Sequence, residues 1–149
     1  MRKGLLIGIV ACALLLAGCS YRCEFVMVNH SASPILVEYT LKSPRRSVDI
    51  NEPAKLTLEE FNKANHNWRD VPKDAYQLDN STSTFTVNVD PGEALLVEHG
   101  INCGGREESQ FDLALIKITG AHGTILANDH QAFSLFKRED SYKYVLRYW

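Results

Sequence analysis

Apolar and polar positions alternate along short stretches of the chain after residue 23, which is typical of β-strands. The alternation is clearest at residues 35–41 and 84–89. A period of two puts successive side chains on opposite faces, so one face of each strand is apolar and packs on a core. With the shorter apolar runs included, the pattern predicts eight strands, at 25–28, 35–41, 84–89, 94–97, 111–118, 125–127, 133–136 and 142–149.

Turn residues separate these strands in neighbouring pairs. The turn-rich segment 29–34 follows the first strand, and Asp90-Pro91-Gly92 follows the third. Gly120 and Gly123 permit positive backbone angles between the fifth and the sixth. The charged residues 137–140 separate the last two. We therefore expect four hairpins, each made of two strands that are consecutive in the chain.

The segment between residues 43 and 80 has an irregular pattern and contains three prolines. Within it, Thr57-Leu58-Glu59-Glu60 matches a capping box, in which a Thr hydroxyl and a Glu carboxylate cap each other's backbone N–H groups. This motif predicts a short helix over 58–65. We expect the rest of the segment to be a long, structured connection.

A length of 149 residues suits one domain of ordinary size. Short strands at spacings of about 8–12 residues favour an all-β fold. We expect residues 23–149 to form an antiparallel two-sheet β-sandwich of the immunoglobulin-like kind, with one short helix in the long connection. A closed barrel is the main alternative.

The first 18 residues have the layout of a secretory signal. Arg2 and Lys3 give a basic start, an apolar run extends from Leu5 to Leu16, and small residues follow. The run is shorter than the roughly 20 apolar residues that a spanning helix needs. We expect residues 1–18 to be a signal peptide that is removed.

The end of this segment, Leu16-Ala17-Gly18-Cys19, resembles the lipobox of bacterial lipoprotein precursors. The resemblance covers the signal and the first mature residue. It implies that the Cys19 thiol receives a diacylglycerol, that cleavage precedes Cys19, and that residues 19–22 tether the domain. Two or three acyl chains suffice for stable membrane anchoring. Ser20, where the similar enteric sorting rule uses Asp for inner-membrane retention, favours an outer-membrane location facing the periplasm in a host with two membranes. The alternative is an ordinary cleaved signal.

Two of the four cysteines, Cys23 and Cys103, are left after Cys12 in the signal and Cys19 are set aside. An even remainder in an exported chain is the pattern of a disulfide, because that compartment is oxidising. We expect a Cys23–Cys103 bond. Two free buried thiols and metal ligation are the alternatives, the second weakened because only His99 lies near Cys103 in the sequence.

Charge and motifs argue against several functions. Removing the signal leaves 14 basic against 18 acidic residues, so the mature part has no electrostatic reason to bind nucleic acid. No catalytic, metal or cofactor motif is present. We expect the five histidines, His30, His66, His99, His122 and His130, to lie in loops or at the surface.

The resulting hypothesis is a membrane-anchored lipoprotein of the cell envelope that acts as a binding or assembly module. It would present loops or an edge strand to an envelope protein partner. The alternative is an envelope hydrolase or small-ligand carrier with a pocket between the sheets or under the 43–80 connection. That alternative predicts that some of four side chains converge in a concave site, namely His66, Asp70, His99 and His122.

Overall fold

The computed structural model describes residues 22–42, 52–63, 66–101, 111–140 and 142–149. These residues form a mostly β structure with two helices. The strands are β1 (Arg22–Asn29), β2 (Ile35–Leu41), β3 (Ala54–Thr57), β4 (Arg69–Asp70), β5 (Tyr76–Asp79), β6 (Thr84–Val89), β7 (Glu93–Ile101), β8 (Leu113–Gly120), β9 (Gly123–Asn128), β10 (Lys137–Arg138) and β11 (Lys143–Tyr148). The helices are α2 (Leu58–Phe61) and α4 (Asp129–Leu135).

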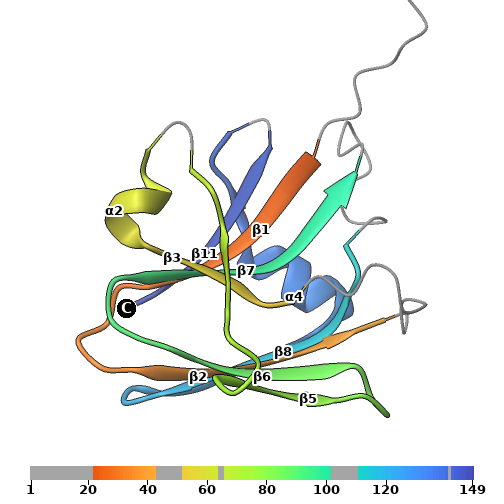
Figure 1. Cartoon of the computed structure of the whole chain (residues 1–149). Helices are drawn as coiled ribbons and strands as arrows, with labels where there is room; N and C mark the ends of the chain where they lie inside the picture. Colours follow the sequence, from red (N-terminus) through yellow and green to blue (C-terminus); the bar gives the residue numbers. More distant parts are fainter. Residues whose placement is uncertain (1–21, 43–51, 64–65, 102–110, 141) are drawn as a thin grey trace, which may run out of the picture.

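Two sheets pack face to face, as Figure 1 shows. Sheet A has the order β10-β11-β1-β7-β3-β4, and sheet B has the order β5-β6-β2-β8-β9. The all-β, two-sheet prediction is confirmed. All pairs in the described residues are antiparallel except β1 with β11, which are parallel. A wholly antiparallel fold was therefore a wrong expectation for this pair.

The apolar pattern explains why the two sheets differ in burial. In β2 and β6 the alternating residues face the interior between the sheets, with buried Ile35, Val37 and Val87 among them. In sheet A the runs Phe25–Val28 and Ala94–Val97 are buried on both faces. A strand that reads as a continuous apolar run has a core on each side.

The second core lies on the outer face of sheet A, beneath α2. It joins Val26, Leu56 and Leu96 of the strands with Phe61 of α2, and the partly buried Trp68 packs against it. Figure 1 shows α2 outside the layer formed by β3, β1 and β7. The interior between the sheets contains the larger core, including an aromatic cluster around Phe25.

The structure confirms one of the expected hairpins and contradicts two others. The pairing of β8 with β9 through the turn after Gly120 is confirmed. The other two well-defined pairs are wrong, because β1 and β2 lie in different sheets, as do β6 and β7. Both connecting turns therefore cross the gap between the layers, which is about 10 Å in packed sheets.

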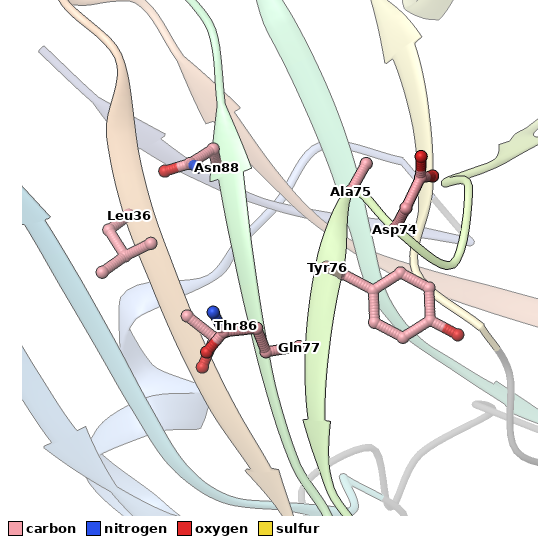
Figure 2. A pocket seen from close by; sticks show the side chains of 7 residues that line it. All are labelled: Leu36, Asp74, Ala75, Tyr76, Gln77, Thr86 and Asn88. Carbon is pink, nitrogen blue, oxygen red and sulfur yellow. The ribbon is translucent and has the colours of Figure 1, made fainter.

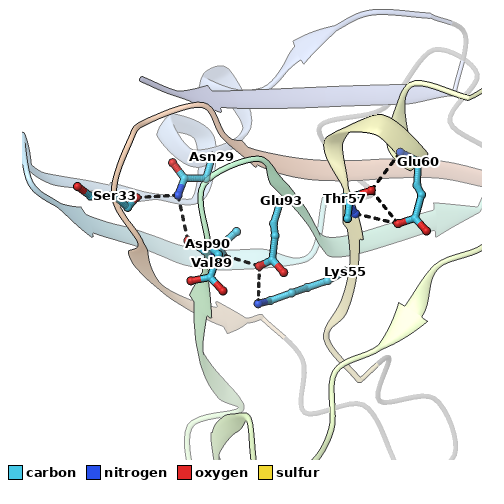
Figure 3. A network of polar contacts seen from close by, with 8 residues as sticks. All are labelled: Asn29, Ser33, Lys55, Thr57, Glu60, Val89, Asp90 and Glu93. Carbon is cyan, nitrogen blue, oxygen red and sulfur yellow. Dashed lines mark hydrogen bonds and ion pairs between the residues drawn. The ribbon is translucent and has the colours of Figure 1, made fainter.

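Asn29 explains why both turns cross at the same place. Its side chain is fully buried, and its Nδ2 donates to the carbonyl oxygens of Ser33 and Val89, both at 3.0 Å. The backbone carbonyl of Asn29 accepts a hydrogen bond from the N–H of Gly92 at 2.9 Å. Figure 3 shows Asn29 between the two turns. One polar side chain thus joins the end of β1 to both crossovers.

The C-terminal third holds the clearest correction. Residues 133–135, predicted as part of a strand, lie in α4, and Phe136 is its C-cap. Ala132 and Phe136 pack into the interior core at a helical spacing of four residues, and the partly buried Phe133 packs against it. A short apolar run fits either period, and here the helical one prevails. The charged pair Lys137–Arg138, expected in a turn, is β10 and pairs with β11.

The long connection also contains more structure than we expected. Its described residues include β3, β4 and β5, so the described chain has more strands than the predicted eight. The capping box at Thr57 is confirmed, but the helix ends at Phe61 rather than near residue 65. Figure 3 shows Thr57 and Glu60 capping each other. The exposed Asn62 and Lys63 follow, where the apolar pattern that holds α2 on sheet A stops.

Candidate functional site

The four edges of the two sheets differ in length and charge. In the described part of the chain the edges are β10 and β4 for sheet A, and β5 and β9 for sheet B. The strands β10 (Lys137–Arg138) and β4 (Arg69–Asp70) have two residues each, all charged, and β5 has four residues and ends in Asp79. Short length and charge are the usual means by which proteins prevent edges from pairing with other chains.

The edge strand β9 lacks both kinds of protection. It has six residues, Gly-Thr-Ile-Leu-Ala-Asn, and no charged side chain. Two of its apolar residues are exposed, Ile125 by 37% and Leu126 by 63%. A six-residue uncharged edge with exposed apolar side chains is suited to accepting a further strand.

The register with β8 shows which backbone groups of β9 face the open edge. Gly120 and Gly123 are paired across a two-residue turn, which makes them a hydrogen-bonded pair. Hydrogen-bonded and non-hydrogen-bonded pairs alternate along an antiparallel ladder. Ile125 therefore bonds to β8, whereas the N–H and C=O groups of Thr124 and Leu126 point away from β8, toward the edge.

The outer face of sheet B beside this edge is polar but internally neutralised. Lys117 of β8, the cross-strand neighbour of Leu126, forms an ion pair with Glu38 of β2. Asp129, which follows β9, pairs with Lys42 at 2.5 Å. Its hydrogen bond to Lys42 is the main reason that the pKa of Asp129 is lowered. The charges closest to β9 in sequence and register are thus compensated within the chain.

A second cluster of polar side chains lies on the outer face of sheet A. Glu24 of β1 accepts a hydrogen bond from Trp68 Nε1 at 2.9 Å and contacts His66 Nε2 at 3.3 Å. The other ring nitrogen of His66 lies 3.2 Å from the Lys63 carbonyl oxygen. His66 lies in a loop, as expected, but its side chain is only 9% exposed.

This cluster brings together two of the four residues in the hydrolase hypothesis. His99 is the cross-strand neighbour of Glu24 on β7, and His66 contacts the same carboxylate. Asp70 is exposed on β4, and His122 is exposed in the turn between β8 and β9. Both ring nitrogens of His66 contact oxygen atoms of the chain itself, so neither is directed at a substrate or a nucleophile. The arrangement fits a structural role, in which these contacts hold the segment after α2 on sheet A.

The described residues also form a pocket of about 190 Å³ on the outer face of sheet B. Figure 2 shows its lining from the turn before β5, from β5 itself, and from β6 and β2. Tyr76 contributes to the wall, but its ring packs on Phe85 at 6.0 Å. Burial is the main reason that the pKa of Tyr76 is raised. The remaining lining residues are Leu36, Asp74, Ala75, Gln77, Thr86 and Asn88.

This pocket gives little support to the carrier hypothesis. Residues 74–77 of its lining belong to the 43–80 connection, but the pocket does not lie between the sheets, and none of His66, Asp70, His99 and His122 lines it. Within the described residues, no group of three histidine, cysteine or acidic side chains is placed to hold a metal ion. Neither helix of the described chain has the length and apolar character needed to span a membrane.

The sequence-predicted cysteine sites are placed only in part. Cys19 and Cys103 lie outside the described residues. Cys23 is fully buried and disulfide-bonded. The described ranges contain no second cysteine, so its pairing with Cys103 stays a prediction.

The remaining histidines lie apart from one another. His130 is exposed on α4. His30 stacks on Trp149 with ring centroids 4.4 Å apart, and Arg147 Nη1 lies 2.7 Å from its Nε2. Because a guanidinium can only donate, His30 accepts at Nε2 and is neutral. Burial, and then the charge of Arg147, lower its pKa.

Sequence reasoning anticipated an edge strand but did not identify β9. The signal is present in the sequence, because among the edge strands of the described residues only 123–128 lacks a charge. That order comes from tertiary pairing. No protein-family model, curated protein or solved structure matches this chain.

Proposed function

We propose that this chain is a lipid-anchored module of the bacterial cell envelope that binds a protein partner by adding a strand to β9. Cys19 is the anchor in this proposal, and an outer-membrane location facing the periplasm is favoured by Ser20. The observation that carries the binding role is the contrast between β9 and the three short, charged edges.

Strand addition supplies main-chain hydrogen bonds for affinity and side-chain contacts for specificity. The outward N–H and C=O groups of Thr124 and Leu126 would supply the first. The exposed side chains of Ile125 and Leu126 would supply the second. A partner that covers these side chains removes their apolar surface from water, which stabilises the complex by about 25 cal/mol for each Å² buried.

Site-specific photo-cross-linking in the producing cells tests this function. A photoreactive amino acid replaces Leu126 in the full chain, and a matched variant carries it at the exposed Gln77 on the edge strand β5. We expect a discrete cross-linked product from position 126 and little from position 77. Equal products from both positions, or none from position 126, would contradict the proposal.

The finer fold assignment is part of the proposal. Strands β2, β3, β5, β6 and β7 follow the immunoglobulin order B, C, D, E and F, because β5-β6-β2 adjoin in one sheet and β3-β7 adjoin in the other. Strands β8 and β1 take the positions of A and G. An experimental structure tests this by whether β8 lies beside β2 and β1 beside β7.

The alternative, an envelope hydrolase or small-ligand carrier, is the weaker candidate. It would have to use the cluster around Glu24 or the pocket beside Tyr76. The first engages both nitrogens of its histidine, and the second is a shallow polar surface on the outside of sheet B. Binding of a small molecule that protects Tyr76 or Gln77 from chemical labelling would favour the carrier.

A further inference from the structure

We propose that the strand added to β9 is the β9 of a second copy of this chain, related by a two-fold axis. This inference rests on the proposed function and identifies the partner. In the dimer the two five-stranded sheets join edge to edge, with β9 antiparallel to its equivalent. Two-fold interfaces are the commonest way in which identical chains associate. Both copies then use the same surface patch, so every contact occurs twice.

The backbone of β9 selects one register for this pairing. Thr124 and Leu126 are the residues whose backbone groups face the edge. When the axis passes through Ile125, Thr124 of each copy lies opposite Leu126 of the other. Each of these two pairs then forms two N–H···O=C hydrogen bonds. Centring the axis on Leu126 would require Asn128, which is the N-cap of α4 and ends the strand.

The same register covers both exposed apolar side chains with their own equivalents. Ile125 lies directly opposite Ile125 of the second copy in a non-hydrogen-bonded pair, whose Cα atoms are about 4.5 Å apart. Leu126 and Leu126 of the second copy lie diagonally on the outer face, about 7–8 Å apart and within reach of long side chains. These are the residues that are 37% and 63% exposed in the single chain.

The charge pattern is the one that self-pairing requires. A two-fold strand pair sets each side chain beside its equivalents, so a charged residue on the strand would face a like charge. β9 has no charged residue. The nearest charged neighbours, Lys117 and Asp129, are paired with Glu38 and Lys42 in the same chain. A heterologous partner does not need this neutrality, whereas a second copy does.

The size of the contact predicts where the dimer forms. A strand of six residues is about 20 Å long, and a single strand pair buries less than the roughly 1,200 Å² of a stable complex. The dimer is therefore weak in dilute solution. Anchoring of copies in one membrane raises their local concentration and favours association.

Disulfide trapping in membranes tests the inference on the full chain. The variant Ile125→Cys is compared with the matched edge variant Gln77→Cys under mild oxidation, followed by a non-reducing gel and mass spectrometry of the linked peptides. We expect at least tenfold more dimer from Ile125→Cys, linked from position 125 to position 125. The double variant Ile125→Cys with Leu126→Lys should lose most of it, because two lysines then meet diagonally.

Two results would overturn the inference. One is an equal dimer yield from Ile125→Cys and Gln77→Cys, and the other is a yield that Leu126→Lys leaves unchanged. Photo-cross-linking at position 126 separates this failure from that of the proposed function. An adduct with a different protein, without a 125–125 disulfide, refutes the second copy but keeps the strand-addition role. The absence of any adduct refutes both.

Discussion

Replacing Asn29 by Asp tests whether one buried amide holds the two crossovers between the sheets. The Asn29 side chain is fully buried and donates two hydrogen bonds, to the carbonyl oxygens of Ser33 and Val89, both at 3.0 Å. Its Oδ1 accepts from the Ser31 N–H and hydroxyl at 3.0 and 2.7 Å. The substitution Asn29→Asp keeps the shape and the acceptors but removes both donors.

The magnitude follows from what is left unpaired. Each buried carbonyl that loses its donor costs about 1–3 kcal/mol, the lost hydrogen bond included, so the two carbonyls together cost about 2–6 kcal/mol. With a carboxylate facing those carbonyls, we expect the free energy of unfolding to fall by about 3–5 kcal/mol at neutral pH, a large part of the 5–15 kcal/mol typical of a domain. Protonation of the new carboxyl restores one donor, so the loss should shrink as the pH falls.

Urea-induced unfolding, followed by tryptophan fluorescence at pH 7 and pH 5, measures this loss. The matched control is Asn88→Asp, which makes the same change at an exposed position on β6 and should alter stability by less than about 0.5 kcal/mol. If Asn29→Asp cost less than about 1 kcal/mol, independent of pH, the assignment of Asn29 as the link between crossovers would be refuted.

Four further predictions concern the far end of the fold and the anchor. The buried Tyr148 hydroxyl has no hydrogen-bond partner among the described residues, so Tyr148→Phe should keep or raise the thermal midpoint; a clear loss would reveal a missed bond. A Cβ at Gly120 would lie 2.5 Å from that hydroxyl oxygen, so Gly120→Ala should destabilise the fold by about 1–3 kcal/mol, and by less in the Tyr148→Phe background in a double-mutant cycle. Because burial and Arg147 lower the pKa of His30 below 6.5, its contribution to stability is complete above pH 6.5 and is lost as the pH falls below that value; His30→Gln should flatten this part of the unfolding free energy against pH, and an unchanged slope would count against it. Finally, Cys19→Ala should move the protein from the membrane to the soluble fraction after cell fractionation, and retention in the membrane would contradict lipid anchoring.

Only part of the candidate site can be predicted from residue patterns. The lack of charge in residues 123–128 is visible in the sequence, as is the hairpin that forms β9. Whether that strand lies at an edge depends on which strands flank β8, and those are distant in the chain. The same holds for His66, which has a polar neighbourhood in sequence but is covered because it reaches Glu24, 42 residues away.

The errors in strand pairing have a common physical cause. Alternation tells which side of a strand is apolar, but an interior between two sheets accepts that side from either sheet. The segments 29–34 and 90–92 have ordinary turn composition, and the bonds that join them through the buried Asn29 form only in the folded chain. The parallel contact of β1 with β11 joins residues more than a hundred positions apart, for which the turn residues give no signal.

The sequence by itself determined most of the strands, the face that each alternating strand buries, and the capping box that starts α2. These depend on side-chain period and on hydrogen bonds between residues a few positions apart, so they are local properties. The tertiary structure decided which sheet each strand joins, that residues 129–135 are helical, that sheet A has a core on both faces, and that β9 is the last strand of sheet B among the described residues. Each of these depends on contacts between distant segments, because backbone pairing is nearly independent of side-chain identity and is selected by the packing of the whole fold.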